Sequence, residues 1–161
     1  MSRLKDMRGF TLVELMITIA ILAIVLSIAA PSFRDILLNN RINTAAQELQ
    51  AAVQIARSEA VKLKQTVTVC AANDDFDACE KTTDWTQGWL LILKDNEVLK
   101  IWTVSDGLNI TGPEDGIVVK GSGMLGVAVE ISAQKKSCSS GVKQTVKVGL
   151  TGIVKMEKGS C

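Results

Sequence analysis

The chain has 161 residues, with 18 Lys and Arg against 17 Asp and Glu, and a formal net charge of +1. This length allows one domain with an appendage, and the charge balance alone indicates neither a nucleic-acid binder nor a polyacidic tail. The chain contains no His, which excludes serine–histidine and cysteine–histidine catalysis and histidine metal sites. We therefore expect neither an enzyme nor a bound cofactor or metal.

The N-terminal part of the chain begins with a basic leader over residues 1–9 and continues as an apolar stretch. No charged residue occurs in the 19 positions between Glu14 and Arg34. A helix of that length is about 28 Å long, close to the roughly 30 Å core of a bilayer. Because the basic residues precede the apolar stretch, we expect a membrane span over about residues 10–33 with a cytoplasmic N-terminus.

A cleaved secretory signal peptide is the alternative interpretation of this start, with residues 27–29 (Ser-Ile-Ala) as its cleavage site. Two features weigh against it. The apolar run is longer than the usual stretch of about 7–15 residues. It also contains Glu14 near its beginning, and a carboxylate at membrane depth is costly unless it has a partner. Both features favour a retained anchor.

Helical periodicity continues beyond the apolar stretch. Apolar residues recur at spacings of three and four from Leu38 to Leu63, and most charged residues lie off this stripe. We expect one helix over residues 10–64, roughly 80 Å long, with Pro31 kinking or restarting it. The second half is amphipathic and rich in Ala, which suits close packing against a sheet.

Short β-type runs separated by turn residues occupy residues 65–161. Several runs alternate apolar and polar residues, so one face of each should be buried. The expected strands are 66–70, 88–94, 98–104, 108–111, 117–120, 127–132, 145–150 and 153–156. The predicted fold class is α+β: a long N-terminal α-helix, half membrane-spanning and half amphipathic, packed on a C-terminal antiparallel β-sheet or β-sandwich domain.

Two motifs that could suggest ligands have simpler interpretations. Residues 121–126 spell Gly-x-Gly-x-x-Gly, but an expected strand follows them where a dinucleotide site needs a helix, so we expect a glycine-rich hairpin. The acidic residues in 73–80 lack calcium-loop spacing and favour a solvated loop. The three dispersed Trp residues are expected in the core.

Residues 9–15 (Gly-Phe-Thr-Leu-Val-Glu-Leu) resemble the processing signature of type IV prepilins and the related pseudopilins, and the match continues to Pro31. The resemblance implies that prepilin peptidase cuts between Gly9 and Phe10 and methylates the amine of Phe10. It also implies that Glu14 pairs with the N-terminal amine of a neighbouring subunit in the filament and sets its register. The alternative is that Glu14 extends to the membrane surface.

Residues 56–62, 67–70, 88–91 and 151–154 resemble minor pilins of the FimT/FimU type, and GspH-type pseudopilins share much of this pattern. The resemblance implies a FimU-like structural minor pilin that contributes to assembly or initiation of a type IV pilus. Its partners would be other pilins and the prepilin peptidase. It would lie in the bacterial inner membrane with a periplasmic domain, and then in the extracellular pilus. The alternatives are a FimT-like DNA-binding pilin in DNA uptake and a GspH-like pseudopilin of type II secretion.

The four cysteines all follow the expected membrane span, on the periplasmic side where disulfides persist. Their spacing contains no Cys-x-x-Cys pair, which argues against a metal site. Three disulfide pairings are open. We favour Cys70 with Cys79, which closes the acidic loop, and Cys138 with Cys161, which ties down the chain end.

Charge is divided unevenly along the chain. Residues 71–119 carry 3 Lys and 10 acidic residues, a net −7, and residues 120–161 carry 7 Lys and 2 acidic residues, a net +5. The basic part could contact DNA phosphates, dock on an acidic neighbouring subunit, or be plain solvated surface. The candidate contacts are Lys135, Lys136, Lys143, Lys155 and Lys158. FimT-type DNA receptors carry arginines after the C-terminal glycine, whereas residues 152–155 here supply only Lys155, so DNA is not the favoured partner.

Overall fold

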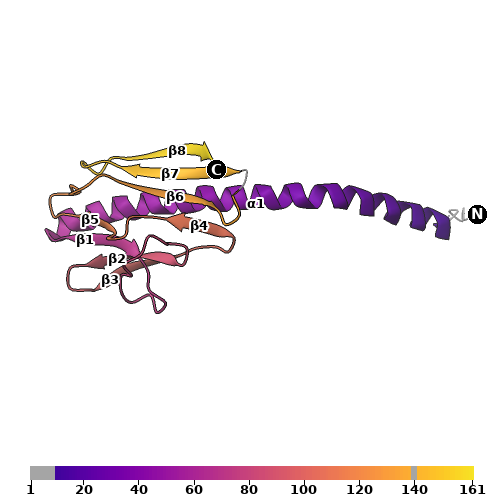
Figure 1. The fold of residues 1–161 in the computed structure, drawn as a ribbon. Coiled ribbons are helices and arrows are strands. Elements are labelled where there is room, and N and C mark those ends of the chain that lie inside the picture. The colour runs from indigo at the N-terminus through magenta and orange to yellow at the C-terminus, as the bar shows by residue number, and fades with distance from the viewer. Residues whose placement is uncertain (1–9, 139–140) are drawn as a thin grey trace, which may run out of the picture. The chain divides into compact units, whose positions relative to one another are not determined.

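The computed structural model describes residues 10–138 and 141–161, so the leader, which includes Gly9, lies outside it. The described chain forms one helix and eight strands (Figure 1). Helix α1 covers Leu12–Leu63 as one element, and the helix is not restarted at Pro31. A proline removes only one backbone donor, and local adjustment can satisfy the freed carbonyl in an apolar helix.

Two compact units divide the chain, the first ending at Leu37 and the second covering Leu38–Cys161. The part of α1 that lies in the first unit has the length and the apolar composition of a helix that could cross a membrane. The large apolar side chains described there are exposed in the isolated chain, from 74% at Leu12 to 42% at Leu37. An apolar surface of this extent needs cover from lipid or from other apolar helices.

The second unit contains two four-stranded antiparallel sheets. The first has the order β3-β2-β1-β5, with strands β1 Val67–Ala71, β2 Gly88–Leu93, β3 Val98–Thr103 and β5 Ile117–Val119. The second has the order β4-β6-β7-β8, with strands β4 Leu108–Thr111, β6 Val129–Lys135, β7 Val142–Val148 and β8 Val154–Ser160. The α+β prediction is confirmed.

The apolar stripe of α1 forms the centre of the main core. Its small residues allow both sheets to approach the helix, and each fully buried Leu, Ile or Val adds about 1.5–3 kcal/mol. The buried α1 residues are Ile42, Ala45, Ala46, Leu49, Ala52, Val53, Ala56 and Ala60. They share one cluster with residues of both sheets, such as Val69 of β1 and Val146 of β7. Trp85 and Trp89 are also buried in it, as expected, whereas Trp102 is half-buried.

A second, smaller cluster covers the other face of the first sheet. It contains Cys70, Ala72, Leu90 and Ile92, with Phe76 packed against them. Strand β2 is therefore buried on both faces, which explains its continuous apolar sequence. The covering residue Phe76 belongs to the acidic loop that follows β1.

Candidate functional site

The beginning of α1 holds Glu14 in a capping box. The backbone N–H of Glu14 donates to Thr11 Oγ1 (3.2 Å), and the backbone N–H of Thr11 donates to Glu14 Oε2 (3.4 Å). This reciprocal pair satisfies two of the free donors at a helix start. Sequence reasoning missed this role, although Thr-x-x-Glu over residues 11–14 is its signature. Phe10 directly precedes the box and is exposed.

Arg57 joins the C-terminal part of α1 to two turns of the β-domain. Its Nε donates to the carbonyl of Gly123 (3.0 Å), in the turn between β5 and β6. Its guanidinium also donates to the carbonyl of Gly152 (3.1 Å), in the turn between β7 and β8. The contact brings together two of the segments that resemble minor pilins, 56–62 and 151–154.

The glycine-rich segment 121–126 forms the turn that Arg57 holds. The N–H of Gly123 donates to the carbonyl of Lys120 (2.8 Å), and that of Lys120 to the carbonyl of Met124 (2.9 Å). Val119 and Leu125 then form an isolated antiparallel bridge. The expected hairpin turn is confirmed.

The acidic loop after β1 is closed by the disulfide Cys70–Cys79. Within it, Asn73 Oδ1 accepts from the N–H groups of Asp77 (3.0 Å) and Ala78 (3.1 Å). The amide of Asn73 also donates to Asp77 Oδ1 (2.7 Å). Among the residues that the structure describes, no group of three or more His, Cys, Asp or Glu side chains could hold a metal ion. The loop acts as the cover of the smaller cluster.

The second disulfide, Cys138–Cys161, fastens the chain end directly after β8. The backbone N–H of Cys161 also donates to the carbonyl of Gly141 (3.2 Å). Strand β8 is an edge strand that, among the described strands, pairs only with β7, and six of its seven residues are exposed. The disulfide therefore holds a strand that contributes little to the core.

Mass spectrometry without reductant tests both the number of disulfides and their pairing. The oxidised protein is expected about 4 Da below the mass of the tetrathiol, because each disulfide removes two hydrogens. A non-reduced peptide map should link Cys70 to Cys79 and Cys138 to Cys161. Peptides that cross-connect the two pairs would contradict the assignment.

The candidate lysines do not form one patch, because the sheet register divides them between two faces. Lys143 and Lys155 lie on the outer face of β4-β6-β7-β8, together with Lys147. The Gln144 amide donates to Asn43 on α1 (2.9 Å), so Gln144 faces the helix. Lys158 is the cross-strand partner of Gln144 and therefore lies on the same, helix-facing side of the sheet. Lys135, opposite the buried Leu108, also lies on that side, and Lys136 follows the end of β6. Strand pairing, which a linear sequence does not state, decides this division.

Lys147 is the best-partnered charge on the outer face. Its Nζ lies 2.8 Å from Glu157 Oε2 and 3.5 Å from Glu130 Oε1. The hydrogen bond with Glu157, followed by the field of Glu130, raises the pKa of Lys147 above its usual value. Lys155 lies directly opposite Lys147 in the register. It forms no ion pair within the described ranges 10–138 and 141–161.

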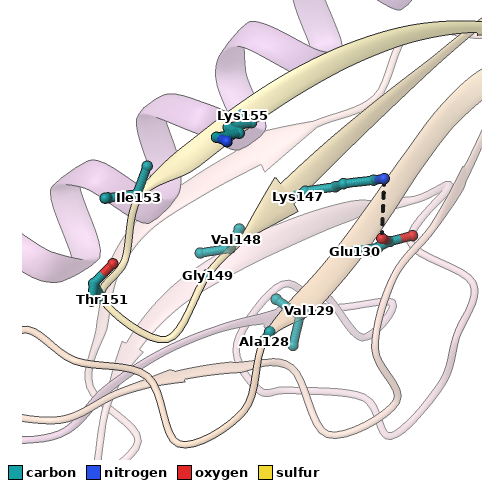
Figure 2. A pocket seen from close by; sticks show the side chains of 9 residues that line it. All are labelled: Ala128, Val129, Glu130, Lys147, Val148, Gly149, Thr151, Ile153 and Lys155. Carbon is teal, nitrogen blue, oxygen red and sulfur yellow. Dashed lines mark ion pairs between the residues drawn. The ribbon is translucent and has the colours of Figure 1, made fainter.

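A shallow hollow of about 490 Å³ lies at the end of this face where β7 turns into β8 (Figure 2). Its lining combines small or apolar residues with charged ones. The lining residues are Ala128, Val129, Glu130, Lys147, Val148, Gly149, Thr151, Ile153 and Lys155. Gly149 is half-buried and has no side chain to fill the hollow. Its backbone N–H donates to the carbonyl of Ile153 (3.0 Å), and the Ile153 residue is 60% exposed. The hollow can therefore accept an apolar group beside an unpaired cation.

The architecture defines a type IV pilin-like protein: an apolar N-terminal helix segment, an amphipathic helix segment and an antiparallel β-domain on the latter. Comparisons with known families agree. Residues 45–152 match the family described as Type II transport protein GspH, and residues 4–30 match the prokaryotic N-terminal methylation motif. The chain therefore belongs to the GspH family. It is a minor pilin or pseudopilin of a type IV pilus or a type II secretion system, a class of structural proteins and not of enzymes.

Individual relatives come from both systems. A fimbrial protein of Pseudomonas aeruginosa is 27% identical over 123 residues, covering 74% of this chain and 77% of the relative. The crystal structure of the type IV minor pilin FimU of Pseudomonas aeruginosa has a TM-score of 0.59 at 19% identity, over 74% of this chain and 90% of that one. The minor pseudopilin EpsH of the Vibrio cholerae type 2 secretion system has a TM-score of 0.53 at 16% identity, over 73% and 96%.

Proposed function

We propose that this chain is a FimU-like structural minor pilin of a type IV pilus. The observation that carries the proposal is the relative named as a fimbrial protein, which is 27% identical and aligned over 77% of its own length. The fold is shared with both FimU and EpsH, with TM-scores of 0.59 and 0.53, so the choice rests on the fimbrial relative. Like these proteins, the chain would act by assembling with other pilins.

The proposed pathway starts in the inner membrane, with the basic leader in the cytoplasm and the β-domain in the periplasm. Prepilin peptidase removes residues 1–9 and methylates the amine of Phe10. The helix then leaves the lipid for a filament in which neighbouring helices cover its exposed apolar side chains. In that apolar setting Glu14 needs a cation, which the amine of a neighbouring subunit supplies. Two disulfides stabilise the β-domain once it is in the periplasm.

Deletion of the gene in its own host tests the choice of filament. We expect surface pili to fall severalfold on quantitative electron microscopy, and the wild-type gene supplied in trans to restore them. Secretion of proteins exported by a type II system should be unchanged, because pilus assembly and secretion use separate filaments. Normal piliation with lost secretion would contradict the proposal and support a GspH-like pseudopilin, the second candidate.

DNA uptake by a FimT-like pilin is less well supported. Phosphate tracking needs cations along one path, whereas the candidate lysines are divided between two faces. On the outer face, two carboxylates, those of Glu130 and Glu157, already pair with Lys147. A gel-shift titration of the purified chain with duplex DNA should show no salt-sensitive micromolar binding. Binding that is lost when Lys135 and Lys136 are replaced would reverse this ranking.

A further inference from the structure

Four cross-strand rows make up the outer face of the sheet β4-β6-β7-β8. The rows run from β6 through β7 to β8, because paired residues in neighbouring strands lie on the same side of a sheet. The second row is Glu130, Lys147 and Lys155, and the third is Ser132, Thr145 and Glu157. The fourth is Gln134, Lys143 and Gly159. The first row contains Gly149 and Ile153 beside the hollow.

The second row contains an unbalanced charge. Lys147 and Lys155 are direct cross-strand partners, and like charges in such positions destabilise a sheet. Both nearby carboxylates, Glu130 and Glu157, bond to Lys147. Lys155 is therefore an exposed cation that adjoins another cation and forms no ion pair with any residue that the structure describes. A carboxylate from outside the chain would relieve this repulsion.

The first row supplies an apolar contact next to that cation. Ile153 is 60% exposed at the rim of the hollow, and the missing side chain of Gly149 leaves space for an apolar group (Figure 2). A surface that combines an exposed Ile, a hollow and interleaved charges of both signs is suited to a protein partner. A nucleic acid would instead favour a continuous basic track.

Another subunit with the same fold can supply the complementary acidic surface. Strands β2, β3 and β5 of the first sheet, together with β4 and the loops between them, lie in residues 71–119, whose net charge is −7, whereas β6, β7 and β8 lie in residues 120–161, whose net charge is +5. A domain whose acidic and basic residues belong to different strands can make repeated heterologous contacts, the type that builds an open helical filament. This inference rests on the proposed function as a filament subunit.

We propose that the end of the outer face around Ile153 and Lys155 is a docking surface for a neighbouring pilin-fold subunit. The partner presents a carboxylate to Lys155 and an apolar side chain to the hollow beside Ile153. Lys147, already bound by two carboxylates, is a fixed neighbour that limits where the incoming carboxylate can lie. Binding needs no movement of the sheet, because every contributing residue is already exposed or lines the hollow.

Photocrosslinking in the full-length chain tests the docking surface. A benzophenone amino acid replaces Ile153 in cells that assemble filaments, and the product is identified by mass spectrometry. We expect a crosslink to a subunit with a prepilin signature, at a peptide that contains Asp or Glu. In the same background Lys155→Glu should reduce the crosslink about tenfold or more, and Lys155→Arg should preserve it. Replacing the contacted Asp or Glu of the neighbouring subunit with Lys should restore the crosslink in the Lys155→Glu variant.

Lys143→Glu is the matched control, because Lys143 lies on the same face about 13 Å along β7 from Lys147. It should leave the crosslink unchanged.

Equal crosslinking of Lys155→Glu and the parent chain would overturn the docking surface, as would a product that contains no pilin-fold subunit. DNA binding by the full chain that both charge reversals weaken equally would also overturn it. If the tagged wild-type chain is absent from sheared filaments, the proposed function itself fails. If it is present but Lys155→Glu crosslinks normally, only the docking surface fails.

Discussion

Replacing Glu14 with Gln is expected to prevent incorporation into the filament while the protein still reaches the membrane. Gln can keep the capping box with Thr11, since either Glu or Gln serves at that position. Gln has no negative charge, so it cannot form the ion pair that we propose between residue 14 and the amine of a neighbouring subunit. An uncompensated buried charge costs about 3–5 kcal/mol, so the filament-bound fraction should fall by about a hundredfold or more. Immunoblots of sheared filaments and of membranes measure the two fractions.

Glu14→Ala and Thr11→Ala separate the two roles of this region. Glu14→Ala removes both the charge and the cap and should also block incorporation. Thr11→Ala removes the Oγ1 acceptor of the Glu14 N–H and keeps the charge, so most incorporation should remain. If Glu14→Gln enters filaments normally and Glu14→Ala does not, capping is the essential role and subunit registration by charge is wrong.

Gly152→Ala is expected to destabilise the β-domain substantially. Gly152 has φ of +73°, a region that costs a non-glycine residue roughly 1 kcal/mol or more. A Cβ there would also overlap the guanidinium of Arg57, so the bonds from Arg57 to Gly152 and Gly123 would be disturbed. We expect a loss of about 2–4 kcal/mol in unfolding free energy.

Gly126→Ala is the matched control for this measurement. A Cβ at Gly126 would meet no atom within 4 Å, and its φ is not in the left-handed region. That substitution should change stability by less than about 1 kcal/mol. Urea unfolding of the full-length chain in detergent, followed by Trp fluorescence, reports the β-domain because Trp85, Trp89 and Trp102 all lie in it. Equal midpoints for Gly152→Ala and Gly126→Ala would show that the Arg57 contact is not a stabilising feature.

Local sequence signals predicted most of the fold. The stripe from Ile42 to Ala60 has a clear helical period, and its members are buried as expected. Strand β4 has the predicted limits, because turn residues stand directly on both sides of it. The last three strands were placed less well. Strand β8 was expected to end at residue 156 but continues to Ser160, since its exposed residues 157–160 have no apolar alternation to mark them.

Long-range geometry explains what the sequence could not provide. The bonds of Arg57 connect residues 66 and 95 positions apart, and no local pattern predicts such contacts. The division of Lys143 and Lys158 between two faces follows from strand pairing, not from their proximity in the chain. Sequence reasoning therefore named the basic segment but not the outer face on which Lys155 opposes Lys147.

Mass spectrometry of the N-terminus of this chain, taken from sheared filaments of its host, tests the account most directly. The account predicts a mature chain that begins with N-methylated Phe10 and lacks residues 1–9. Cleavage at another position, such as after Ala29, would contradict it, because the anchoring helix and Glu14 would be absent from the mature protein. Absence of the chain from filaments, with the unprocessed form confined to the membrane, would contradict it equally.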